Sequence, residues 1–140
     1  MGATITTNKI MEAVDAGSHG TTFGGNPFAC AVAVENLNIF RDEGLLENAN
    51  KVSTYLFPAL EKLRQKYPAI IKEIRGKGLM IGIQFKGKVA DAVKKLQERG
   101  VLVLVAGMTV VRLLPPLVIS LEQAKQVVDA LEAVLGEMKE

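Results

Sequence analysis

The sequence has 140 residues, of which 49% are apolar and 23% charged, and its formal net charge is +2. This length allows a domain with a real hydrophobic core, and the near-neutral charge argues against a nucleic-acid-binding protein. No apolar run is long enough to span a membrane, and we therefore expect neither nucleic acid nor membrane as a partner.

A glycine-rich loop precedes the first long predicted helix. Residues 17–27 contain four glycines, the adjacent Thr21 and Thr22, and an Asn-Pro step. Asn26 is a good N-cap, and Pro27 suits the first helical position. Exposed N–H groups and hydroxyls that lead into a helix N-terminus can bind an anion, although such a loop can equally serve only as a turn. The Gly-Lys-Ser/Thr ending of a P-loop is absent.

Two helices are predicted after this loop. Residues 27–43 form the first, which ends before Gly44 and has enough alanine and valine in its first half to be buried on most sides. Cys30 lies in this apolar pattern and is the only cysteine, which is typical of a reducing, cytoplasmic compartment. Residues 45–67 form the second helix, in which we expect Pro58 to introduce a kink or a break. The apolar stripe of the second helix is Leu45, Ala49, Val52, Leu56, Leu60, Leu63 and Tyr67.

The hydrophobic pattern then changes from helical to alternating. Residues 70–75 and 79–85 predict two strands, joined by a turn at residues 76–78. A short helix follows and ends at Gly100. The continuous apolar run at residues 101–105 predicts a strand that is buried on both faces or lies at an edge of the core. The second strand should turn Leu79, Ile81, Ile83 and Phe85 to one face.

The last strand and helix complete the predicted fold. Residues 109–113 form a strand that Pro115-Pro116 ends, and Ser120 with Gln123 forms a capping box for a final helix. Interleaved helices and strands with short connections favour an α/β (α+β) two-layer sandwich, in which helices cover a small, mainly antiparallel sheet.

Arg112 is a lone cation in the apolar strand 109–113. A buried guanidinium is costly without a partner, so it should pair with a carboxylate of the protein or of a ligand. The alternative is an arginine at a strand end whose guanidinium reaches water. The pattern of residues alone favours this alternative.

Three segments of the sequence resemble motifs of one enzyme family. Residues 19–31, His-Gly-Thr-Thr-Phe-Gly-Gly-Asn-Pro-Phe-Ala-Cys-Ala, are similar to a segment of the class III pyridoxal-phosphate aminotransferases, especially the acetylornithine and ornithine types. Residues 112–119, Arg-Leu-Leu-Pro-Pro-Leu-Val-Ile, resemble a second motif of that family. Residues 75–82, Arg-Gly-Lys-Gly-Leu-Met-Ile-Gly, resemble a third, which we interpret as turn geometry and packing rather than chemistry.

The resemblance implies roles for individual residues. Thr22, together with Thr21, would contact the phosphate of pyridoxal 5'-phosphate bound to the neighbouring subunit of a homodimer. Arg112 would bind the α-carboxylate of the amino-acid substrate. Residues 1–27 would be the tail of the large cofactor-binding domain, and residues 28–140 the small C-terminal domain of the fold type I architecture. The implied reaction transfers an amino group from N-acetylornithine or ornithine to 2-oxoglutarate, as in arginine biosynthesis.

Two groups that transamination requires are missing from the sequence. They are the lysine that binds the cofactor and the acid that keeps the pyridine nitrogen protonated, and in the family both precede the segment matched here. We therefore expect a C-terminal piece that is not catalytic alone. The only histidine, His19, has no cysteine or carboxylate partners with which it would form a metal site.

Two other functions remain open. The chain could be a free-standing binding or interaction module that keeps the scaffold without the chemistry. It could also be a protein that binds phosphate or nucleotides through the loop at residues 17–27.

Overall fold

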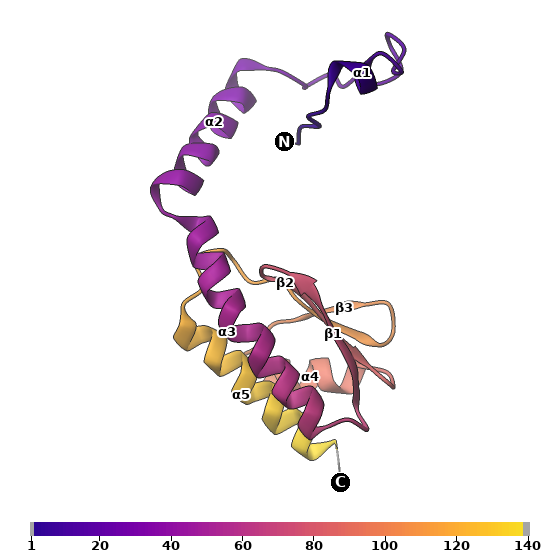
Figure 1. Ribbon diagram of the computed structural model, residues 1–140, viewed down its shortest axis with the longest axis vertical. Coiled ribbons are helices and arrows are strands. Elements are labelled where there is room, and N and C mark those ends of the chain that lie inside the picture. Colours follow the sequence, from indigo (N-terminus) through magenta and orange to yellow (C-terminus); the bar gives the residue numbers. More distant parts are fainter. Residues whose placement is uncertain (1, 139–140) are drawn as a thin grey trace. The chain divides into compact units, whose positions relative to one another are not determined.

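The structure is a computed structural model that describes residues 2–138 (Figure 1). The chain forms two units, one that ends at Glu43 and one that begins at Gly44. The first unit contains α1 (Asn8–Met11) and α2 (Pro27–Asp42), and the second contains the remaining helices and all described strands. None of the described helices combines the length and the apolar character that crossing a membrane requires.

The helix predicted after the glycine-rich loop is confirmed as α2. Its start is set by Asn26, whose Oδ1 accepts a hydrogen bond from the Ala29 N–H at 2.9 Å. The predicted burial of this helix is wrong, because Phe28 is 80% exposed, Leu37 is 70% exposed, and no residue of α2 is buried. The reason is that no other element of the first unit forms a layer over its apolar side chains.

The second predicted helix is confirmed as α3 (Leu45–Lys66). Its whole apolar stripe is buried. The helix continues through Pro58, so of the two outcomes predicted there the break does not occur, and the kink stays a prediction. A proline inside a helix costs about 3 kcal/mol. Leu56 and Leu60, which are only 2% and 1% exposed, lie on both sides of Pro58. Burial of such side chains contributes about 1.5–3 kcal/mol each, so packing outweighs the cost of the proline.

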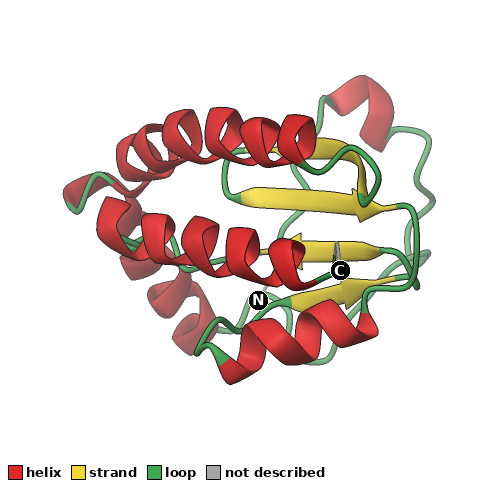
Figure 2. Cartoon of the chain, turned by 90° about the horizontal axis from the view of Figure 1, so that it is seen from below, coloured by secondary structure: helices red, strands yellow, loops and turns green. Residues whose placement is uncertain are grey.

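The strands form one four-stranded antiparallel sheet in the order β1-β2-β4-β3. The helix α4 connects β2 to β3, and α5 follows β4. The predicted α/β two-layer sandwich is thereby confirmed, and Figure 2 shows its helical layer and its layer of strands. The bounds are β1 (Ile71–Lys77), β2 (Met80–Phe85), α4 (Ala90–Glu98), β3 (Leu104–Ala106), β4 (Val110–Leu113) and α5 (Leu121–Glu137).

The core lies between the helices and one face of this sheet. The predicted inward row of the second strand is confirmed, since Leu79, Ile81, Ile83 and Phe85 are all buried. The predicted capping box of α5 is also confirmed. Ser120 Oγ accepts a hydrogen bond from the Gln123 N–H at 3.1 Å, and Gln123 Oε1 accepts one from the Ser120 N–H at 2.9 Å.

The apolar run at residues 101–105 forms less strand than predicted. Only Leu104–Ala106 pairs, at the edge of the sheet, and Leu102 is 82% exposed. The prediction that this strand is buried on both faces is therefore wrong, and the alternative prediction, a strand at an edge of the core, is correct. The ladder begins at Leu104, opposite Arg112. Extending it by three more residues would place Pro115 opposite Val101, and proline has no N–H to donate.

The hairpin between β1 and β2 is tighter than the sequence indicates. β1 extends through Gly76 and Lys77, so the turn consists of Gly78 and Leu79. A Cβ atom at Gly76, whose φ is 150°, would lie 2.1 Å from the Met80 carbonyl oxygen. Only glycine permits this approach of the two strands.

Replacing a leucine of the buried stripe should destabilise the second unit. We expect Leu60→Ala to lower the free energy of unfolding by about 2–5 kcal/mol, because it leaves a cavity beneath α3. The matched control is Leu46→Ala in the same helix, where Leu46 is 60% exposed and the change should cost little. Urea denaturation monitored by circular dichroism measures both. Equal losses in the two variants would contradict the described packing of α3.

Candidate functional site

The candidate residues lie in both units of the chain. Thr21 and Thr22 belong to the loop before α2, in the first unit, and Arg112 belongs to β4, in the second. The geometry within each unit defines what its residues can bind.

The loop before α2 is a tight turn held by short-range hydrogen bonds. The Gly24 N–H donates to the Thr21 carbonyl at 3.3 Å, and Asn26 Nδ2 donates to the Phe23 carbonyl at 2.5 Å. A Cβ at Gly24 would lie 2.3 Å from Thr21 Cγ2, so a larger residue at this position would displace the Thr21 side chain. Thr21 and Thr22 are exposed. Neither hydroxyl forms a hydrogen bond within residues 2–138.

These residues fit a phosphate group. Two free hydroxyls lie a few residues before the N-terminus of α2, where the first N–H groups of a helix have no intrahelical acceptor. The helix dipole favours negative charge at that end. The loop can therefore donate hydrogen bonds to a phosphate from hydroxyls and from backbone.

Arg112 projects from the face of the sheet opposite the helices. Its neighbours along β4, Val111 and Leu113, are buried in the core, and successive side chains of a strand point to opposite faces. Its cross-strand partners are Gly82 on β2 and Leu104 on β3. Arg112 therefore stands in a row that contributes nothing to the core.

The guanidinium of Arg112 has an unsatisfied donor. Its Nε is buried but has no hydrogen-bond partner, and Arg112 forms no ion pair with any residue that the structure describes. Leaving a buried donor unpaired costs about 1–3 kcal/mol. Arg112 as a whole is only partly buried, and Nη1 and Nη2 are not among its buried atoms, so the end of the guanidinium can still reach water. A ligand carboxylate would supply the missing acceptor.

Two lysines of the second unit have environments unsuited to nucleophilic chemistry. A lysine that attacks a carbonyl needs a lowered pKa, because only the neutral amine reacts. The hydrogen bond from Lys66 Nζ to Glu132 raises the pKa of Lys66. Burial lowers the pKa of Lys95, but Asp91 and Glu137 outweigh burial and hold it above its usual value.

The part of the chain that the structure describes also offers no cluster of three or more histidine, cysteine, aspartate or glutamate side chains for a metal ion.

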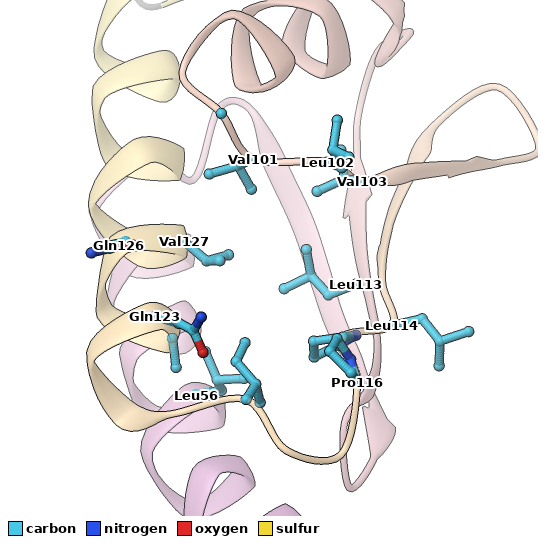
Figure 3. A pocket seen from close by; sticks show the side chains of 14 residues that line it. Leu56, Val101, Leu102, Val103, Leu113, Leu114, Pro116, Gln123, Gln126 and Val127 are labelled. Carbon is cyan, nitrogen blue, oxygen red and sulfur yellow. The ribbon is translucent and has the colours of Figure 1, made fainter.

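A cavity of about 350 Å³ lies in the second unit, and its lining includes Leu113 and Leu114 but not Arg112. Figure 3 shows Val101 and Val103 on one wall and Leu113 and Pro116 on another, with α5 closing the side. The lining is mostly aliphatic and includes no ionisable side chain, so this cavity has no group for acid–base or ionic chemistry. It marks the place where the edge strand separates from β4.

Sequence reasoning missed Arg75, which it assigned to turn geometry. In the structure Arg75 pairs with Gly82, and Gly82 pairs with Arg112 on its other side, so the two arginines share one face of the sheet. The alternation of β1 could have indicated the direction of Arg75. The strand order, which places β2 between β1 and β4 and so brings Arg75 near Arg112, has no signal in the sequence.

Comparison with known proteins identifies one family. The sequence pattern of the class-III aminotransferases matches residues 1–135. The chain is 40% identical over 138 residues to the mitochondrial acetylornithine aminotransferase of Eremothecium gossypii, covering 99% of the chain and 32% of the relative. It is 41% identical over 134 residues to ornithine aminotransferase 1 of Staphylococcus aureus, covering 96% of the chain and 33% of the relative.

Solved structures give the same result. The acetylornithine aminotransferase of Elizabethkingia anophelis aligns with a TM-score of 0.81 and 37% identity, over 95% of this chain and 34% of that chain. The ornithine aminotransferase of Plasmodium yoelii aligns with a TM-score of 0.84 and 33% identity, over 95% and 36%. The chain thus spans about a third of the length of the relatives it matches.

The junction between the loop and α2 should depend on Asn26. We expect Asn26→Ala to destabilise the first turn by about 1 kcal/mol, because the Ala29 N–H loses its acceptor. Amide hydrogen exchange at Ala29 and Cys30 should then accelerate about fivefold on that arithmetic. The control is Asn36→Ala in the middle of the same helix, which removes no cap. Unchanged exchange in Asn26→Ala would show that another group fixes the start of α2.

Proposed function

We propose that this chain, which belongs to the class III aminotransferase family, is the C-terminal part of a pyridoxal-phosphate-dependent aminotransferase. The substrates we propose are N-acetylornithine or ornithine-like amino acids, with 2-oxoglutarate as the amino acceptor, in the cytoplasm. The observation that carries this proposal is the buried, unpartnered Nε of Arg112. This guanidinium lacks a hydrogen-bond acceptor that a carboxylate can supply, and every substrate of this reaction carries a carboxylate.

The glycine-rich loop would hold the cofactor through its phosphate. The hydroxyl of Thr22, with that of Thr21 beside it, would donate to phosphate oxygens near the N-terminus of α2. In a homodimer this phosphate would belong to the cofactor of the neighbouring subunit. When bound, pyridoxal phosphate supplies a ring that accepts electrons from the substrate. Residues 1–27 would then end the large domain, and residues 28–140 would form the small one.

Arg112 would orient the amino acid. A guanidinium offers two parallel N–H donors to a carboxylate, which fixes the direction of the substrate as well as its position. Because β4 is paired on both sides, by β2 and β3, the backbone position of Arg112 is fixed. Such a fixed clamp determines which substrate atom faces the reacting groups.

The chain alone should lack transaminase activity. Lys66 and Lys95 have raised pKa values, which oppose nucleophilic attack. No lysine of the sequence lies in a motif for binding the cofactor covalently. The lysine and the acid that the reaction requires would have to come from the large domain.

The first test uses the isolated chain. We expect no turnover with N-acetylornithine or ornithine and 2-oxoglutarate. After pyridoxal phosphate is added and reduced with borohydride, intact-mass spectrometry should show only scattered, partial labelling of exposed lysines. Stoichiometric labelling of one lysine would contradict the assignment of the catalytic lysine to another part of the enzyme.

The second test uses the complete enzyme. Arg112→Lys keeps the charge but loses the two parallel hydrogen bonds to the carboxylate. We therefore expect kcat/KM for amino acids to fall by an amount that corresponds to about 2–5 kcal/mol of lost transition-state stabilisation. The melting temperature should barely change, because Arg112 has no partner in the described structure. The control is Arg64→Lys on α3, where the arginine pairs with Glu61 at the surface.

Amines without an α-carboxylate complete this test. Their slow turnover should not respond to Arg112→Lys, because they have nothing for the arginine to bind. A variant with normal rates on amino acids and a lowered melting temperature would instead assign Arg112 a structural role.

A further inference from the structure

The segment that connects β4 to α5 has few hydrogen bonds of its own. It begins two residues after Arg112, where the ladders of β4 have ended. In the part of the chain that the structure describes, residues 114–119 form one backbone hydrogen bond, from the Ile119 N–H to the Pro116 carbonyl at 3.0 Å. Chain ends and loops with few contacts open more readily than the interior of a sheet. The strand end that carries Arg112 therefore leads into a weakly bonded segment.

Arg112 itself lies close to the open end of the hairpin formed by β3 and β4. Its pair with Leu104 is the last one of that ladder, whereas the turn at residues 107–109 closes the opposite end. On the side of β2, one further pair follows, between Leu113 and Ile81. Opening of this end by two residues would release the backbone of Arg112 from both neighbouring strands.

One side chain of α3 holds the segment after β4. Asn48 Nδ2 donates to the Leu117 carbonyl at 2.6 Å and to the Ile119 carbonyl at 3.1 Å. Both partners are acceptors, so they require the nitrogen of the amide and not its oxygen. Among the described residues, no other side chain forms a hydrogen bond with residues 114–119. Asn48 thus ties the chain after Arg112 to a helix about 70 positions earlier in the sequence.

The anchor on α3 is well fixed, and the connection to β4 is stiff. Asn48 is half-buried in the first turn of α3, beside the buried Leu45 and Ala49. Pro115 and Pro116 lie between Arg112 and Leu117, and each proline ring fixes its own φ. A constraint at Leu117 is therefore carried back toward the end of β4.

We propose that Asn48 is a positioning residue for Arg112. By holding the Leu117 and Ile119 carbonyls, it keeps the end of β4 paired. The guanidinium of Arg112 then stays where it can donate two parallel hydrogen bonds to a carboxylate. This inference rests on the proposed carboxylate-binding role of Arg112. A substrate whose carboxylate is less well oriented loses reaction rate as well as affinity.

The first readout is amide hydrogen exchange in the 140-residue chain. Asn48→Ala removes both hydrogen bonds to the segment. Exchange at Arg112 and Leu113 should accelerate about tenfold, and exchange at Val110, beside the turn, should change much less. Equal acceleration from Val110 to Leu113 would indicate general destabilisation and overturn the proposal.

The matched control is Ser120→Ala, one residue beyond Ile119. It removes the cap of α5, a loss of similar size, but leaves both hydrogen bonds of Asn48 in place. Exchange should accelerate in the first turn of α5 and not at Arg112. If Ser120→Ala released Arg112 as much as Asn48→Ala does, the effect would not be specific to Asn48.

The second readout is catalysis by the complete enzyme. Asn48→Ala should lower kcat/KM for amino acids about tenfold and leave the slow turnover of amines without an α-carboxylate unchanged. In an Arg112→Lys background the same substitution should have little further effect, because the carboxylate is already misplaced there. Ser120→Ala should change neither activity.

The outcomes separate this inference from the proposed function. A full tenfold loss from Asn48→Ala in both backgrounds would show that Asn48 does not act through Arg112, and would leave the role of Arg112 intact. Normal rates of Arg112→Lys on amino acids would overturn the role of Arg112 and this inference with it. If Asn48→Ala does not fold, Asn48→Ser, which keeps a single O–H donor, replaces it in both readouts under the same criteria.

Discussion

The sheet of this protein buries only one of its faces, and the candidate chemistry depends on that asymmetry. On β2 and β4, Ile81, Ile83 and Val111 lie under the helices, while Gly82 and Arg112 alternate with them on the other side. A slip of one residue in the pairing would exchange the two sets. The hydrophobic core therefore fixes the register, and the register fixes where the arginine points.

Local signals in the sequence were sufficient for most of the fold. Asn26 and the Ser120–Gln123 pair set helix starts through contacts three residues apart, and these were predicted correctly. The errors arose where distant segments decide. Pro58 stays inside α3 because the stripe around it packs against the sheet and α5. The run at 101–105 pairs with β4 only from Leu104 onward.

Burial on α2 and the position of Arg75 could not be predicted for a related reason. The periodicity of apolar residues shows that one face of a helix is apolar, but it does not show which structural element covers that face. Likewise, alternation gives the side of a strand on which Arg75 lies, but not the strand that lies beside it. The motif at residues 75–82 combines a hairpin, which glycine at position 76 explains, with an arginine that the hairpin does not need.

Arg112 differs from every other arginine of this chain in what surrounds it. Arg41, Arg64, Arg75 and Arg99 each form an ion pair with a neighbouring carboxylate, and the structure describes none for Arg112. Its unpaired Nε costs about 1–3 kcal/mol, in a fold whose total stability is typically 5–15 kcal/mol. An apolar residue in the same strand would avoid that cost. The carboxylate ligand proposed for Arg112 would complete its hydrogen bonds and remove that cost.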